Sequence, residues 1–195
     1  KQIAAGSEQP ALADMTRRAI ELLQWNPGGY LLIVDAGLMG TAARQNHGEQ
    51  TLAETVELDR AVGVANAYTG ENSTVMVAGN LGIGGLALNG APFRRDSGIA
   101  ILGVNAAGEP ALTWATGPNG PKNRPEQSQS EESTPGAEVS GLSATAQPQE
   151  PAASYAPSAR GNVADVLAAG RGPGSENLRG FLDNTAIFKI IRDQL

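Results

Sequence analysis

The chain of 195 residues has no cysteine, a single histidine and few aromatic residues. Without cysteine it can form neither disulfides nor thiolate metal sites. With only His47 it cannot build a metal centre that needs two or three imidazoles. Aromatic residues make up 4% of the chain, so leucine, isoleucine, valine and alanine must fill its core.

Long hydrophobic runs and basic stripes are also missing. No window reaches the roughly 18 consecutive apolar residues of a membrane-spanning helix, so we expect none. The formal net charge is -6, and an acidic chain without clustered cations argues against nucleic-acid binding. The opening Lys1-Gln2-Ile3 leads directly into polar sequence, so we expect no signal peptide in this chain.

The most informative stretch begins with a continuous apolar run, Tyr30 to Val34, which follows an Asn-Pro-Gly-Gly turn. Five apolar residues without polar alternation favour a strand buried on both faces, as in a parallel sheet. Asp35 stands at its carboxyl end, where ligands bind in open α/β sheets. We therefore expect any chemistry to lie between Asp35 and His47.

Helical patterns flank this stretch. Apolar residues at helical spacing predict an amphipathic helix from about Pro10 to Trp25, and another is expected from about Glu49 to Tyr68. Near the end of the chain, Asp183 precedes Asn184-Thr185 in the manner of a helix N-cap. This pattern predicts a last helix with isoleucines facing inward.

Strand patterns follow the second helix. Thr74 to Ala78 reads as a second buried strand, which we expect beside Tyr30 to Val34 in one largely parallel sheet. Shorter strands, separated by turn residues, are predicted at Leu86 to Leu88, Ile99 to Val104, Leu112 to Trp114 and Val163 to Ala169.

The composition changes between Gly117 and Arg160, where Pro, Ser, Gln and Glu dominate and large apolar residues nearly vanish. Such a stretch buries too little area to offset its ordering entropy. It predicts a flexible insertion without regular secondary structure. The domain interpretation is therefore a core from 1 to 116, an insertion from 117 to 160, and a closing strand and helix from 161 to 195.

Five local patterns occur in the order found in one family. They are the Leu-Ala-Asp-Met-Thr helix from Leu12, the strand ending at Asp35, Leu-Ala-Glu-Thr-Val from Leu52, Gly-Arg-Gly-Pro-Gly from Gly170, and Asn-Thr-Ala-Ile-Phe from Asn184. Together they resemble the second half of the alkaline phosphatases. The resemblance implies an α/β three-layer sandwich with a mostly parallel sheet and helices on both faces. It also implies a periplasmic or extracellular location.

The resemblance further implies where metal ligands would stand. In the family a Glu at the first strand's end binds magnesium, and Asp and His residues bind zinc. Asp35 keeps the carboxylate at the Glu position. The zinc-ligand positions are instead occupied by residues unsuited to zinc, namely Gly40, Arg44, Gly79, Asn80, Gly82 and Gly161.

Three side chains remain as candidates for binding. Asp35 could hold magnesium weakly, or could simply bond nearby backbone amides as strand-end aspartates do. Arg44 stands at a former zinc position and Arg160 beside another. These two could bind an anion, or could be ordinary surface arginines. His47 lies in a polar turn and is expected to be exposed and to bind nothing.

These observations predict a catalytically degenerate alkaline-phosphatase-like domain that serves as a structural or binding subunit of a larger assembly. No cofactor is expected, with zinc absent and magnesium the one metal left open. The expected partner is another polypeptide supplying the family's first half, or further copies of this chain. The alternative is a metal-dependent phosphomonoesterase or sulfatase-type hydrolase whose remaining ligands come from another chain.

Overall fold

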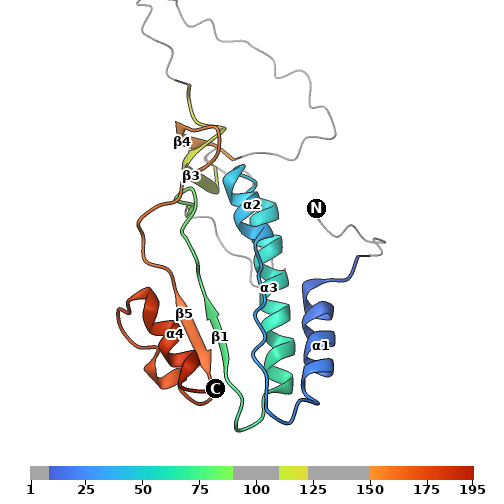
Figure 1. The fold of residues 1–195 in the computed structure, drawn as a ribbon. Coiled ribbons are helices and arrows are strands. Elements are labelled where there is room, and N and C mark those ends of the chain that lie inside the picture. The colour runs from blue at the N-terminus through green and yellow to red at the C-terminus, as the bar shows by residue number, and fades with distance from the viewer. Residues whose placement is uncertain (1–8, 90–109, 123–149) are drawn as a thin grey trace, which may run out of the picture. The chain divides into compact units, whose positions relative to one another are not determined.

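A computed structural model describes residues 9–89, 110–122 and 150–195 (Figure 1). The chain divides into two compact units. The first unit contains Lys1–Ala42, Glu49–Ile83 and Gly161–Leu195, and the second contains Ala43–Gly48 and Gly84–Arg160. Both units therefore combine segments that are remote in sequence.

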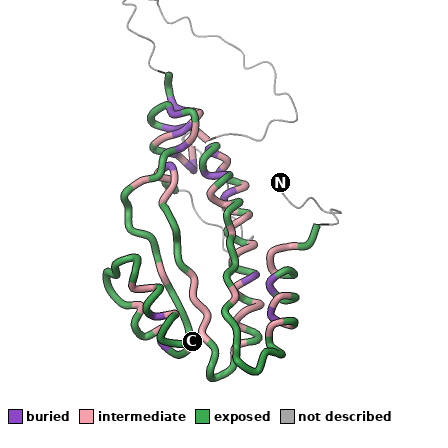
Figure 2. The backbone as a smooth tube through the Cα atoms, viewed as in Figure 1, coloured by how far each residue is buried: buried purple, intermediate pink, exposed green. Residues whose placement is uncertain are grey.

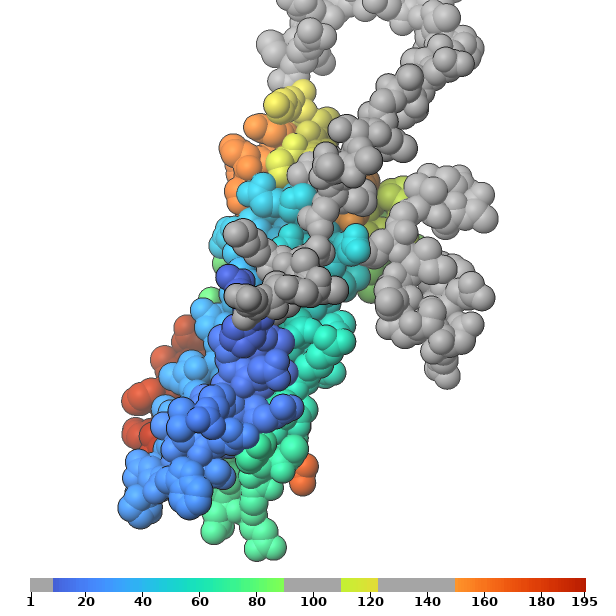
Figure 3. Space-filling model, turned by 90° about the vertical axis from the view of Figure 1, so that its right-hand side faces the viewer, coloured from blue at the N-terminus to red at the C-terminus, as the bar shows by residue number. Residues whose placement is uncertain are grey.

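The predicted helices are present. They are α1 (Leu12–Leu23), α3 (Gly48–Tyr68) and α4 (Asn184–Arg192), and a short α2 (Leu38–Arg44) follows Asp35. In α1 the buried Thr16 and Ile20 lie one turn apart, as an amphipathic helix requires. Helices α1 and α3 lie side by side in the first unit (Figures 1 and 3).

A hydrogen bond links these two helices. The Tyr68 hydroxyl at the end of α3 donates to the Glu21 carboxylate, with 3.2 Å between the oxygens. Desolvation and this hydrogen bond raise the pKa of the Tyr68 phenol.

The strands of the first unit pair differently from the prediction. Strand β1 (Val75–Ala78) pairs antiparallel with β5 (Ala168–Arg171), and Val75 stands opposite Arg171. The strand predicted over 163–169 thus begins later and runs the other way relative to β1. A 3-10 turn, η1 (Ser175–Asn177), follows β5, and the β1–β5 ribbon lies between α4 and α3 in Figure 1.

The strand predicted at Tyr30 to Val34 does not form. These residues are assigned to neither helix nor strand, and Ile33 keeps 81% of its surface exposed. Exposure extends along much of 24–35, drawn largely in green in Figure 2. A buried central strand needs a hydrogen-bonded neighbour on each side, and no described residue supplies one. The expected pairing with Thr74 to Ala78 was therefore wrong.

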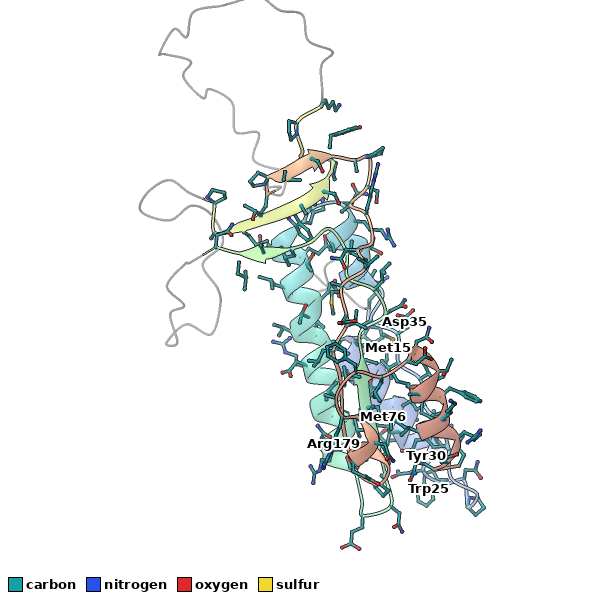
Figure 4. All side chains as sticks on the ribbon, turned by 90° about the vertical axis from the view of Figure 1, so that its left-hand side faces the viewer. Met15, Trp25, Tyr30, Asp35, Met76 and Arg179 are labelled. Carbon is teal, nitrogen blue, oxygen red and sulfur yellow. The ribbon has the colours of Figure 1, made fainter. Side chains whose placement is uncertain are left out.

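The second unit contains a three-stranded sheet in the order β2 (Ala87–Leu88), β3 (Leu112–Gly117) and β4 (Ala152–Tyr155). Strands β2 and β3 are antiparallel and β3 and β4 parallel, and they lie side by side in Figure 4. Leu112, Trp114 and Asn46 are its largest fully buried side chains. The strand predicted at Ile99 to Val104 lies outside the described residues.

Strand β4 corrects the interpretation of 117–160 as lacking regular structure. The segment 117–160 is polar in composition, but long-range hydrogen bonds hold residues 150–160 in place. The Glu150 carboxylate accepts a hydrogen bond of 2.7 Å from the amide of Gly48, the first residue of α3. The Trp114 indole donates to the same oxygen over 3.4 Å. Glu150 therefore caps a helix that begins 102 residues earlier in the sequence.

The chain thus has an α/β fold with small sheets of mixed direction. The mostly parallel sheet expected from the sequence is not found among the described strands. In the described residues, no helix is long and apolar enough to cross a membrane.

We expect Glu150→Ala to lower the free energy of unfolding by about 0.5–2 kcal/mol, the usual cost of losing a helix cap. The Gly48 amide and the Trp114 indole would both lose their acceptor. Urea unfolding followed by tryptophan fluorescence measures the change. Glu71→Ala, at an exposed position, is the control. An equal effect of both substitutions would show that Glu150 does not cap α3.

The cap of α4 predicts a pH dependence. Hydrogen bonds from the Thr185 side chain and amide lower the pKa of the Asp183 carboxyl below its ordinary value of 3.8. Because the folded-state pKa is the lower one, this stabilisation is present above the ordinary pKa and disappears as pH falls through the folded value.

Asp183→Asn is the matched variant, since it keeps a side-chain oxygen that can cap the helix but does not titrate. Helicity should fall more steeply in the parent than in this variant as pH drops from about 6 to about 2. Circular dichroism would report the difference, and identical curves would contradict the assignment.

Candidate functional site

Two segments carrying the degenerate metal positions meet in the first unit. The Asn162 amide donates to the Gly82 carbonyl over 2.8 Å, and the Gly79 amide donates to the Leu167 carbonyl over 2.9 Å. Directly beyond the first of these contacts, Ile83 and Gly161 form an isolated antiparallel bridge. Gly79, Asn80, Gly82 and Gly161 thus lie on one pair of hydrogen-bonded segments, 79–83 and 161–167.

The space beside these glycines is occupied. A Cβ atom on Gly79 would stand 2.8 Å from the Val166 Cβ, and one on Gly161 would stand 2.8 Å from a Leu81 methyl. On Gly82 it would clash with the Asn162 amide oxygen, and on Gly40 it would meet Ile83 at 3.3 Å. Neighbouring side chains therefore fill the places from which metal-binding side chains would project.

The two side chains with oxygen atoms that could bind a metal, Asp35 and Asn80, are both exposed. Asp35 follows the irregular 30–34 segment, and its carboxylate makes no hydrogen bond with any described residue. Bonding of this carboxylate to nearby amides, the simpler expectation, is not seen. Figure 4 shows Asp35 and Tyr30 at opposite ends of this segment.

Arg44 does not belong to the unit that holds the glycines. It lies at the end of α2 in the second unit, together with Arg160. The Ala159 amide donates to the Arg44 carbonyl over 2.8 Å, so Arg44 is held beside the residue that precedes Arg160. Arg44 thus belongs to one compact unit and Gly40, Gly79 and Gly161 to the other, and the single pocket predicted to contain them stays a prediction.

Other site residues were missed or misjudged from the sequence. The side chains that close the former ligand positions, Leu81, Ile83, Asn162 and Val166, carry no motif and contact the glycines only through long-range pairing. His47 was expected to be exposed but is half-buried. It follows Asn46, which is fully buried with a φ of 56° and donates to the Thr116 carbonyl.

The family comparison supplies the deciding observation. The family model described as "Alkaline phosphatase" matches residues 1–195. The chain belongs to the alkaline phosphatase family. The resemblance deduced from its local patterns is thus confirmed.

Curated relatives match a shorter stretch. The tissue-nonspecific alkaline phosphatase of Gallus gallus is 41% identical over 68 residues, which is 35% of this chain and 13% of that protein. The human tissue-nonspecific isozyme is 37% identical over the same shares. The membrane-bound alkaline phosphatase of Bombyx mori is 38% identical over 71 residues, 36% of this chain and 13% of its own. The matched stretch thus spans about an eighth of these relatives.

Zinc does not fit the residues that stand at the family's ligand positions. A catalytic zinc takes about three protein ligands from His, Cys or carboxylate. Here the positions offer four glycines, the exposed Asn80 and a guanidinium, none of which binds zinc well. A single exposed carboxylate at Asp35 is a poor magnesium site as well, because magnesium takes a near-octahedral shell of oxygens.

The closed space around Gly79 can be tested by substitution. We expect Gly79→Ala to destabilise the protein by about 1–3 kcal/mol, since overpacking against the Val166 Cβ forces a backbone shift. Gly63→Ala is the control, because nothing lies within 4 Å of a Cβ at that position in α3. Alanine there should stabilise the helix by about 0.5–1 kcal/mol.

Urea unfolding midpoints of the two variants and the parent measure both effects. An unchanged or raised midpoint for Gly79→Ala would mean that the space beside Gly79 is open and could admit a ligand side chain.

Proposed function

We propose that this chain is a catalytically degenerate member of the alkaline phosphatase family that acts as a structural or binding subunit of a larger assembly. The observation that carries the proposal is the packing at the former ligand positions. Gly40, Gly79, Gly82 and Gly161 lack ligand side chains, and Ile83, Val166, Asn162 and Leu81 stand where such side chains would begin. The proposed loss of metal ligands thus involves the packing around these glycines as well as the chemistry of the side chains.

The donor set supports the same conclusion. Catalysis by metal ions requires ligands that hold the ion and leave a position open for substrate. In the first unit the family positions retain only the Asp35 carboxylate and the Asn80 amide. We therefore propose that the domain binds no zinc and takes no catalytic part in ester hydrolysis.

Exposed apolar residues support a role in assembly. The irregular segment at 30–34 exposes Leu31 and Ile33, with Trp25 82% exposed nearby in sequence. Its backbone amides and carbonyls make no strand pairing, and exposed apolar surface of this kind marks interaction sites. We propose that another polypeptide with the family's remaining strands, or further copies of this chain, pairs with this segment to complete a three-layer sandwich.

The family also bears on location. We propose a periplasmic or extracellular protein, in keeping with a family whose relatives include one named as membrane-bound. The chain's lack of cysteine fits any compartment.

The test is an assay of the native assembly together with its zinc content. We expect no hydrolysis of p-nitrophenyl phosphate above the buffer rate with zinc and magnesium added, and substoichiometric zinc after dialysis. An active alkaline phosphatase assayed in parallel is the control. Stoichiometric zinc with turnover would support the alternative instead, a hydrolase whose ligands another chain completes, and the intact mass of the assembly would identify that chain.

A further inference from the structure

The sequence contains one acceptor motif for N-linked glycosylation, Asn72-Ser73-Thr74. Such a motif is an asparagine followed by any residue except proline and then by serine or threonine. No other asparagine of the sequence has serine or threonine two positions further on. An N-linked oligosaccharide on this chain is thus confined to Asn72.

Asn72 lies in the turn that connects α3 to β1 (Figure 1). The Ser73 amide donates to the Gly70 carbonyl over 3.2 Å, which closes a four-residue turn. Residues 70–73 are all exposed. Among the described residues, none forms a hydrogen bond with the Asn72 side chain. Its carboxamide is therefore open to a modifying enzyme.

The last residue of the motif is bonded by a segment that comes late in the chain. The Thr74 hydroxyl donates to the Pro173 carbonyl over 2.6 Å, across 99 residues. A Cβ atom on Gly172 would clash with the Ser73 carbonyl, so the same late loop packs tightly against the motif. At a synthesis rate of about 5–20 residues per second, those 99 residues take roughly 5–20 s. The motif is thus available to an enzyme before the fold engages Thr74.

We propose that Asn72 is an N-glycosylation site that carries an oligosaccharide when the chain passes through a secretory pathway. In the transfer, the Asn72 side-chain nitrogen forms a bond to the anomeric carbon of the oligosaccharide and releases one proton to water. The bond from that carbon to a lipid pyrophosphate carrier breaks, and the carrier leaves. The proposal rests on the extracellular location proposed above and on no statement about catalysis.

An oligosaccharide at this turn also limits how an assembly can form. It is bulky and hydrophilic, so a partner cannot cover the turn between α3 and β1. The composition of the turn agrees with this, because residues 70–73 include no large apolar side chain. Leu31 and Ile33, in the segment proposed to pair with a partner, are instead apolar and exposed. The first unit thus offers separate surfaces for a partner and for an oligosaccharide.

The test is expression of the full chain, with a signal peptide added, in a secreting eukaryotic cell. Peptide-N-glycosidase should lower the mass of the parent, and peptide mass spectrometry should find Asn72 converted to aspartate. Asn72→Gln should abolish the mass loss, since no acceptor remains. Asn80→Gln, at an exposed asparagine outside any acceptor motif, is the control and should leave the mass loss unchanged.

Variants of Thr74 separate the acceptor motif from the local fold. Thr74→Ser keeps the hydroxyl and the motif and should still be modified, whereas Thr74→Val lacks both and should not be. Because transfer precedes the contact between Thr74 and Pro173, protein retained in the cell gives the same readout where a variant folds poorly.

Three results would overturn the proposal. They are an unmodified Asn72 in the parent, a mass loss retained by Asn72→Gln, and modification of Thr74→Val. A glycosylated chain that hydrolyses p-nitrophenyl phosphate would contradict the proposed loss of catalysis alone. An unmodified and inactive chain would contradict the glycosylation site alone, so the two tests are distinguishable.

Discussion

The backbone pairing of residues 79–84 with 160–167 is the constraint on which the rest of the structure depends. The hydrogen bonds at Gly79, Gly82 and Gly84 join segments about 80 residues apart in sequence. Contacts of this range bring the closing part of the chain back to β1, and the β1–β5 ribbon continues the same pairing. Because the approach is close, small residues are needed along it, and the glycines meet that need.

The same constraint explains why the former ligand positions are not simply empty. Gly79 and Gly161 are exposed, and Leu81 and Val166 keep 47% and 43% of their surface, so these contacts lie at the surface of the first unit. Leu81, Asn162 and Val166 fill the space beside the glycines from the opposing segment. A larger side chain at Gly79, Gly82 or Gly161 therefore requires movement of its neighbour, which is the packing on which the proposed loss of the ligands rests.

Local features of the fold were predictable from the sequence and long-range ones were not. The helices follow from spacing and caps within a few residues, such as Asp183 before α4. The prediction of a strand at 30–34 was wrong because a buried strand depends on neighbouring strands that no local sequence pattern specifies. Residues 150–160 read as unstructured by composition, yet Glu150, Ala159 and Arg160 are held by partners far away in sequence.

The candidate site was predictable to a similar degree. The resemblance sets Gly79, Gly82 and Gly161 at zinc-ligand positions, which stays a prediction. The structure places the three glycines on one pair of hydrogen-bonded segments. The resemblance could not identify the side chains that fill the space, because they belong to no motif. Nor could the resemblance predict which residues surround Arg44. Its carbonyl accepts a hydrogen bond from the Ala159 amide, which lies far away in sequence.

Electrostatics bears on the proposal that several metal-ligand positions changed together. Carboxylates grouped to bind a dication repel one another when the ion is absent, and each then has a raised pKa and a cost to folding. A partial ligand set would keep that cost without holding the metal, since affinity requires about three ligands together. A chain that does not hold zinc is therefore more stable with all of the ligands replaced than with one or two retained. The single retained carboxylate, Asp35, is exposed to water, where an unpaired charge costs little. Arg44 and Arg160 are likewise exposed, so their guanidiniums remain solvated.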